Sequence, residues 1–147
     1  MPEQDTIRRA RRDAAEGKSP STQAGEFVRE EIEHVREGKH GARSAKQAIA
    51  IGLSKARRAG VKLPPPDSSK TSAKTRRKAE LDSKSAQKPH KPAKKRSRAI
   101  TAALKREGKS AGSSSALGRQ TRKAAARRTK KDRSASAKKA ARTRKRR

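Results

Sequence analysis

The sequence predicts an all-α protein, a small helical hairpin followed by a largely disordered basic tail with transient helices. Leu, Ile, Val and Phe account for only 14 of 147 residues, and so few bulky apolar side chains with a high net charge are typical of disorder. Nine of those 14 lie between residues 27 and 63. Helix-capping residues punctuate the same stretch, whereas residues 64–147 consist mainly of Lys, Arg, Ala, Ser and Pro.

Residues 1–18 are predicted to be a polar, flexible leader, and residues 19–63 a helical hairpin module. The first helix is expected over about 20–37. Ser19 is a suitable N-cap for it, Pro20 a suitable first helical residue and Gly38 a suitable stop. The helix has one apolar stripe, with Phe27 beside it. The stripe consists of Ala24, Val28, Ile32 and Val35.

The second helix is predicted over about 45–59. Ser44 and Gln47 form an S-x-x-Q capping box before it, and Gly60 ends it. We expect Gly52 to mark a close approach of the first helix, because glycine in an exposed helix interior costs about 1 kcal/mol relative to alanine. Val61 and Leu63 are then expected to fold back as an apolar clip. The face toward the first helix comprises Ala45, Ala48, Ile49, Gly52, Leu53 and Ala56.

The tail, residues 64–147, starts with three consecutive prolines and is low in complexity. Two of its segments carry enough Ala, Leu or Ile to become helical, about 94–107 and 115–130. Charge is concentrated here. Residues 1–37 hold 7 basic and 9 acidic side chains, residues 38–66 hold 7 basic and no acidic ones, and residues 67–147 hold 30 basic and 5 acidic ones.

Composition excludes several classes of protein. Cys is absent, so there is no disulfide framework, zinc ribbon or thiol nucleophile. Trp and Tyr are also absent and Phe occurs once, which rules out the aromatic stacking platforms of many RNA-binding folds. No Walker A, G-x-G-x-x-G or G-x-S-x-G pattern is present. We therefore expect neither an enzyme nor a cofactor.

A metal site is not expected either. His34 and His40 are separated by five residues across the predicted end of a helix, which is a poor spacing for zinc. The third histidine, His90, lies in the tail and has no Cys partner.

A net charge of +30 points to polyanions as partners. Basic residues of the second helix and its flanks form one candidate surface, and the clusters of the tail form another. The candidate nucleic-acid-binding residues are Lys39, Arg43, Lys46, Arg57, Arg58, Lys62, Lys94, Lys95, Arg96, Arg98, Lys105, Arg106, Arg119, Arg122, Lys123, Arg127, Arg128, Lys130, Lys131, Arg133, Lys138, Lys139, Arg142, Arg144, Lys145, Arg146 and Arg147.

The first helix also carries acidic residues at helical spacing. We interpret them either as a solvated face or as an acidic stripe that docks the basic tail or a basic partner. Glu31 falls within the apolar sector instead, so its burial requires a partner, either Lys55 or a residue across a dimer. The predicted acidic stripe consists of Glu26, Glu30, Glu33 and Glu37.

Two resemblances follow from these residues. Residues 43–57 read Arg-Ser-Ala-Lys-Gln-Ala-Ile-Ala-Ile-Gly-Leu-Ser-Lys-Ala-Arg. This stretch resembles an R-S-x-K-Q-A-I-A-I-x-L-S-x-A-R signature of small, basic, mostly bacterial proteins of unknown function, and the Glu-rich residues 26–31 fit the helix that precedes it there. The tail resembles those of linker histones and bacterial histone H1-like proteins, through segments 92–95 (Pro-Ala-Lys-Lys) and 138–141 (Lys-Lys-Ala-Ala).

The function expected first is sequence-nonspecific DNA binding by an architectural, histone H1-like protein, cytoplasmic and associated with the nucleoid. Binding to RNA or to the ribosome is the first alternative, because extended basic tails suit ribosomal RNA equally well. A protein–protein adaptor that uses the acidic-faced hairpin is the second. Self-association through the hairpin into a homodimer is compatible with each of them, and no membrane partner is expected.

Overall fold

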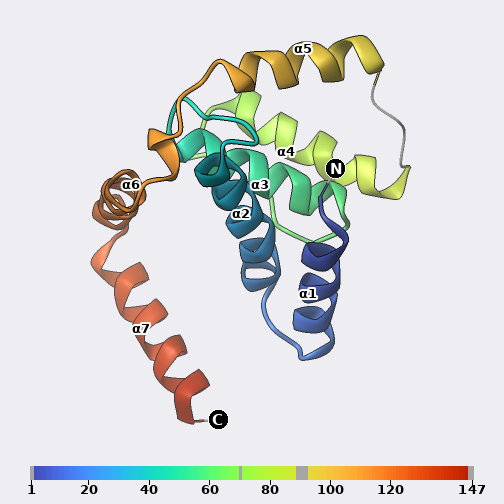
Figure 1. The fold of residues 1–147 in the computed structure, drawn as a ribbon. Helices are drawn as coiled ribbons and strands as arrows, with labels where there is room; N and C mark the ends of the chain where they lie inside the picture. The colour runs from blue at the N-terminus through green and yellow to red at the C-terminus, as the bar shows by residue number, and fades with distance from the viewer. Residues whose placement is uncertain (1, 70, 89–92, 146–147) are drawn as a thin grey trace.

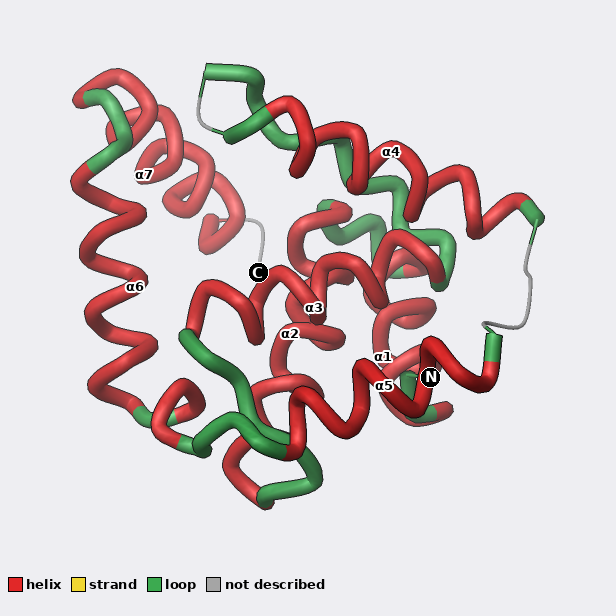
Figure 2. Tube along the Cα trace, turned by 90° about the horizontal axis from the view of Figure 1, so that it is seen from above, coloured by secondary structure: helices red, strands yellow, loops and turns green. Residues whose placement is uncertain are grey.

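The computed structural model describes residues 2–69, 71–88 and 93–145, and in them the fold is all-helical with no strand (Figure 1). Helix α3 lies between α2 and α4 and contacts both (Figures 1 and 2). The elements, in chain order, are α1 (Gln4–Ala15), α2 (Pro20–Glu37), α3 (Ala45–Arg58), α4 (Ala73–Gln87), α5 (Lys94–Lys105), the 3-10 helix η1 (Ser110–Gly112), α6 (Ser114–Ala126) and α7 (Lys130–Lys145).

The α2–α3 hairpin begins and ends at the capping residues that the sequence indicates. Ser19 Oγ accepts a hydrogen bond from Thr22 N–H at 3.4 Å, and Gly38 ends α2 in the left-handed conformation with φ 78°. Ser44 Oγ accepts from Gln47 N–H at 3.2 Å. In a standard capping box the Gln47 side chain would accept from the backbone N–H of the N-cap residue, Ser44. Here its Oε1 accepts instead from the backbone N–H of the preceding residue, Arg43, at 2.8 Å.

Gly52 brings the two helices of the hairpin into close contact, as its position in the sequence predicts. A Cβ atom there would lie 2.6 Å from Val28 Cα and 3.0 Å from the backbone oxygen of Phe27. Both atoms belong to the neighbouring helix backbone, which cannot move aside as a side-chain end can. The side chains around this contact are small, which allows the two helix axes to approach. Those buried on the α3 side are Ala45, Ala48 and Ala56.

The flexible leader predicted for residues 1–18 is instead a helix, α1, that packs against α2. Ala10 is buried with Phe27 in one core cluster, and Ile7 packs against the same cluster. Arg9 Nε donates to Glu26 Oε2 at 2.6 Å, which adds an ion pair to the apolar contact. Only two apolar side chains of α1 pack in this cluster, so a count of bulky apolar residues in the sequence does not predict that α1 packs on α2. The expected clip is present, since Val61 and Leu63 join this cluster too.

The largely disordered tail predicted for residues 64–147 is not supported. Four α-helices and η1 lie in this region, including α5 and α6 close to the predicted 94–107 and 115–130. Helix α4 packs on α3 through Ala79 and the buried carboxylate of Asp82, whose Oδ2 accepts from Ser54 Oγ at 2.5 Å. The tail thus docks through alanine, backbone and single polar contacts, which composition does not reveal.

A second part of the tail docks on the loop between α2 and α3. The N–H groups of Gly41 and Ala42 donate to the carbonyl oxygens of Leu104 (2.9 Å) and Gly108 (3.1 Å). Ala111 of η1 is buried beside Val35 in the other core cluster. In contrast, α5 and α7 bury none of their described residues, and α7 extends away from the rest of the molecule (Figure 1).

A buried group of charges links α2 and α3. Glu30 and Glu31 are 2% and 1% exposed. Lys55 Nζ lies 3.2 Å from Glu30 Oε1 and 2.6 Å from Glu31 Oε2, so the predicted partner of Glu31 is confirmed within the chain. The backbone N–H of Glu3 also donates to Glu30 Oε2 at 3.1 Å. One ammonium therefore forms ion pairs with two adjacent carboxylates in the core.

Gly52→Ala is expected to lower the free energy of unfolding by about 1–3 kcal/mol, because the new methyl group overpacks the α2–α3 contact. Gly25→Ala is the matched control. A Cβ at this exposed position of α2 meets nothing within 4 Å, so the change is expected to stabilise by about 0.5–1 kcal/mol through helix propensity. Urea unfolding followed by circular dichroism measures both. Equal effects of the two variants would contradict the close approach.

Lys55→Met is expected to lower the free energy of unfolding by about 3–5 kcal/mol, because it leaves two buried carboxylates without their cation. Arg29→Met is the control. It removes an exposed i, i+4 pair with Glu33 and is expected to change stability by about 0.5 kcal/mol or less. The same urea experiment measures both variants, and a loss below 1 kcal/mol for Lys55→Met would show that the buried group is not held as described.

Candidate nucleic-acid interface

A cleft of about 230 Å³ lies where the start of α3 meets α6. Four cationic side chains converge on it, two from each side, and no acidic side chain lines it among the residues that the structure describes. The lining residues are Arg43, Ser44, Ala45, Lys46, Ser110, Ala111, Ala116, Arg119, Gln120 and Lys123.

The α3 side of the cleft is fixed by the cap of that helix. Ser44 sets the first turn, so Arg43 just before it and Lys46 just after it are held beside the helix N-terminus. The first backbone N–H groups of a helix have no acceptor within the helix, and the helix dipole is positive at this end. The backbone and the two side chains therefore favour an anion at the same place.

The α6 side is positioned by η1, which anchors the start of α6 to α2. Arg36 Nε donates to the carbonyl oxygen of Gly112 at 2.7 Å. Ser113 then caps α6, since its Oγ accepts from Ala116 N–H at 3.2 Å. Arg119 and Lys123 are four residues apart and thus lie on one face of α6. Docking of the tail is consequently what places these two cations opposite the start of α3.

The chemistry of the cleft suits phosphate groups. Arginine offers planar paired donors that match phosphate oxygens, and lysine adds a compact charge. The four cations of the cleft repel each other until an anion enters between them. Contacts of this kind fix the position of a nucleic-acid backbone but do not read its sequence.

Several other basic residues predicted around the hairpin make contacts with acceptor groups of the chain itself. Lys39 pairs with Glu37 at 3.1 Å and with Glu3 at 3.2 Å, and these hydrogen bonds raise the pKa of Lys39. Arg57 is half-buried and donates to the carbonyl oxygen of Pro64 at 3.3 Å, and burial lowers its pKa. Arg58 lies 4.0 Å from a carboxylate oxygen of the buried Asp82.

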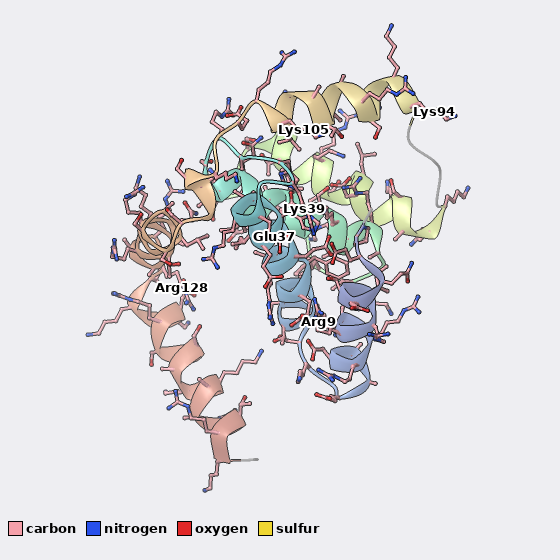
Figure 3. All side chains as sticks on the ribbon, in the orientation of Figure 1. Arg9, Glu37, Lys39, Lys94, Lys105 and Arg128 are labelled. Carbon is pink, nitrogen blue, oxygen red and sulfur yellow. The ribbon has the colours of Figure 1, made fainter. Side chains whose placement is uncertain are left out.

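Lys62 and the predicted basic residues of the tail that are described are all exposed. Lys94 and Lys105 mark the two ends of α5 on the outside of the molecule, and Arg128 lies at the junction of α6 and α7 (Figure 3). Arg146 and Arg147 lie outside the described residues, as does His90. The described tail cations thus extend the positive surface from the cleft along α5, α6 and α7.

The predicted acidic stripe is wrong as a single docking face. Glu30 is buried against Lys55, and Glu26 pairs with Arg9 of α1. The two remaining members stay on the surface and pair locally, Glu33 with Arg29 at 3.0 Å and Glu37 with Lys39 at 3.1 Å. The packing of α1 pairs Glu26 with Arg9, and the packing of α3 buries Glu30.

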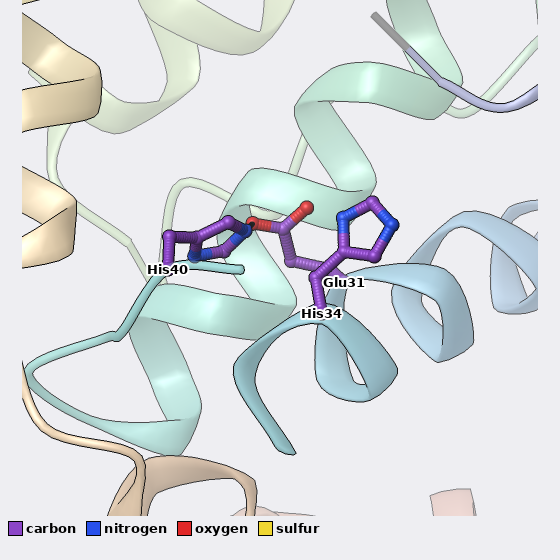
Figure 4. A group of neighbouring side chains, drawn as sticks. All are labelled: Glu31, His34 and His40. Carbon is purple, nitrogen blue, oxygen red and sulfur yellow. Dashed lines mark ion pairs between the residues drawn. The ribbon is translucent and has the colours of Figure 1, made fainter. Parts of the chain in front are cut away.

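The spacing argument against a metal site also fails in three dimensions. The loop after α2 folds back, so the imidazole of His40 lies near that of His34, and both flank the carboxylate of Glu31 (Figure 4). Glu31 and His34 are three residues apart on one helix, a spacing that places both side chains on one face. That spacing was the signal available in the sequence.

Comparison with known proteins gives one family match, over part of the chain, and no activity. Neither a curated protein nor a solved structure matches the chain. None of the helices in the described part of the chain combines the length and the apolar content that crossing a bilayer requires. The model of one family does match, and its range extends upstream of the predicted module to take in α1. Residues 4–67, which span α1, α2, α3 and the segment after them, match DUF6496, a family of unknown function.

Proposed function

We propose that this protein binds the phosphate backbone of nucleic acid without reading its sequence, with duplex DNA as its first target. The observation that carries the proposal is the cleft between α3 and α6. Two cations from each side face one opening with no acidic residue among the described residues that line it. A surface of this kind is stabilised by an incoming polyanion, since each phosphate it neutralises relieves repulsion among its cations.

The charge of the tail supports the same partner class. Residues 67–147 hold 30 basic and only 5 acidic side chains, and one of those acids, Asp82, is buried. Binding by so many exposed cations releases condensed counterions, so it is strong at low salt and weakens steeply as salt rises. The likeness of the tail to linker-histone tails makes DNA the first choice and an architectural, nucleoid-associated role the matching biology.

Binding to the phosphate backbone of nucleic acid also agrees with the burial of Phe27 in the core. The single aromatic residue apart from histidine, Phe27 of α2, is 1% exposed and lies in a core cluster with Ala10 of α1 and Ala56 of α3. It is therefore not available to stack on a base, the usual way in which proteins hold unpaired nucleotides. The cleft offers charges at fixed positions instead, which is sufficient for binding that ignores sequence.

The double variant Arg119→Gln/Lys123→Gln tests the cleft. It is expected to make the slope of log affinity against log salt shallower by about 2, because each lost phosphate contact contributes about one unit. Fluorescence anisotropy of a labelled duplex at several salt concentrations measures this slope. The control, Arg8→Gln/Arg11→Gln, removes the same charge from exposed positions of α1 that lie outside the candidate nucleic-acid-binding residues, and it is expected to change the slope by less than half as much.

Equal losses in the two variants would show that net charge alone matters and would remove the cleft from the interface. Failure of the unchanged protein to bind duplex DNA or RNA at low salt would overturn the proposed function itself.

Two duplexes of equal length and unrelated sequence are expected to bind with affinities within about 3-fold of each other, because phosphate contacts carry no sequence information. Competition experiments at one fixed salt concentration measure this. A preference of more than about 10-fold for one duplex would contradict backbone binding. A preference of that size for an RNA stem-loop over both duplexes would transfer the target from DNA to RNA.

A further inference from the structure

Three side chains that the proposed function does not use converge beside the α2–α3 loop. Glu31 and His34 come from α2, and His40 comes from the loop (Figure 4). One ligand atom of each lies within 4.8 Å of those of the other two. Glu31 is 1% exposed, and the two histidine side chains are 13% and 15% exposed. The group is thus mostly buried, with its imidazoles at the edge of the solvent.

The hydrogen bonds of His40 fix which of its nitrogens is free. Nδ1 lies 3.0 Å from the carbonyl oxygen of Gly41, which can only accept, so Nδ1 carries the proton. Nε2 lies 3.1 Å from Glu31 Oε1. A neutral imidazole would place its lone pair against a carboxylate oxygen here, so either a proton or a metal cation must lie between the two atoms.

His34 is held in a related way. Its Nε2 lies 2.9 Å from Glu3 Oε1, so a protonated Nε2 donates to that carboxylate and Nδ1 is left as the free nitrogen. Imidazoles that bind metals commonly donate their second nitrogen to a carboxylate or a backbone carbonyl, which orients the ring and raises its basicity. Glu3 supplies the first kind of partner to His34, and Gly41 supplies the second kind to His40.

We propose that Glu31, His34 and His40 form a binding site for one divalent transition metal of the zinc class. Two imidazoles and one carboxylate are a typical three-residue zinc ligand set that leaves a fourth position for water. Zinc bonds of about 2.0–2.2 Å require the ligand atoms to approach to roughly 3.3–3.6 Å, so the rings close inward on binding. Their partial exposure leaves them room to rotate.

The surrounding charges accept a divalent cation. Lys39 is shared between Glu3 and Glu37, and Lys55 between Glu30 and Glu31, so four carboxylates face two ammonium groups. Lys55 contacts Oε2 of Glu31, the oxygen that does not face His40. Glu31 can therefore bind a metal through Oε1 and keep its ion pair with Lys55 through Oε2.

A bound metal would fasten the α2–α3 loop to α2. This loop carries Arg43 of the cleft, and its Gly41 and Ala42 N–H groups hold the tail at Leu104 and Gly108. Metal binding is thus expected to stabilise the docked tail together with the hairpin. The site itself is independent of the proposed nucleic-acid binding, since none of its three ligands lines the cleft.

Histidine NMR spectra of the untagged, full-length chain test the site directly, because the chain has only three histidines. With ZnCl₂ as the probe, the imidazole signals of His34 and His40 are expected to shift until one equivalent is bound, whereas the signal of His90 stays unchanged. The melting temperature is expected to rise by about 5 °C or more at saturating zinc.

Variants separate coordination from folding. His40→Gln and His34→Gln are each expected to weaken zinc binding by more than about 10-fold, and His90→Gln, the matched control, is expected to leave it unchanged. Circular dichroism of each variant without zinc shows whether it is folded. If a variant does not fold, the zinc-dependent shifts of His34 and His40 in the unchanged chain decide whether the site binds zinc.

Three results would overturn the proposal. The first is the absence of any zinc-dependent shift. The second is a shift of all three histidines in parallel, which indicates weak surface binding. The third is a shift of His40 alone, which leaves a simple ion pair of imidazolium with Glu31 as the role of that ring.

Discussion

The arrangement of the helices depends on burying two adjacent carboxylates, Glu30 and Glu31, against the single ammonium of Lys55. Buried charges are tolerated only when paired with good geometry. This requirement sets where α3 lies along α2, since Lys55 must reach both oxygens while Gly52 admits the α2 backbone. The same carboxylates bind the N-terminal segment through the backbone of Glu3 and face the loop after α2. Apolar bulk alone is too sparse in this chain to impose such a register.

The loop between α2 and α3 lies next to these buried charges and binds part of the tail. Its backbone N–H groups at Gly41 and Ala42 hold the segment after α5, and η1 then fits against α2. Because α6 follows η1 directly, its cations come to face the first turn of α3. The basic cleft is therefore a product of tail docking and not of either part alone. The outer helices α5 and α7 carry charge without burying any described residue, so they remain available to a polyanion.

The hairpin was predictable because its signals are local. The helix ends are set by residues that bond to their own chain neighbours, namely Ser19, Gly38 and Ser44. A glycine inside a helix, Gly52, indicates that another helix approaches closely there. The four cations of the cleft were predicted as phosphate ligands, but not as one group. Their convergence depends on contacts more than 60 residues apart in sequence, made by backbone atoms and alanines. The helix in the leader, the docking of α4 and the histidine pair were missed for the same reason, since chain folding and not sequence spacing brings their partners together.

The most direct test of the docked tail is to measure the distance between α3 and α6 in the absence of nucleic acid. The chain has no cysteine, so spin labels can be placed at Ala50 and Thr121, both exposed, and a control pair at Ala50 and Ala137 reports on α7. Pulsed electron resonance is expected to give one narrow distance for the first pair and a broader distribution for the second. A broad distribution for the first pair that narrows only when DNA is added would contradict a cleft built by docking of the tail.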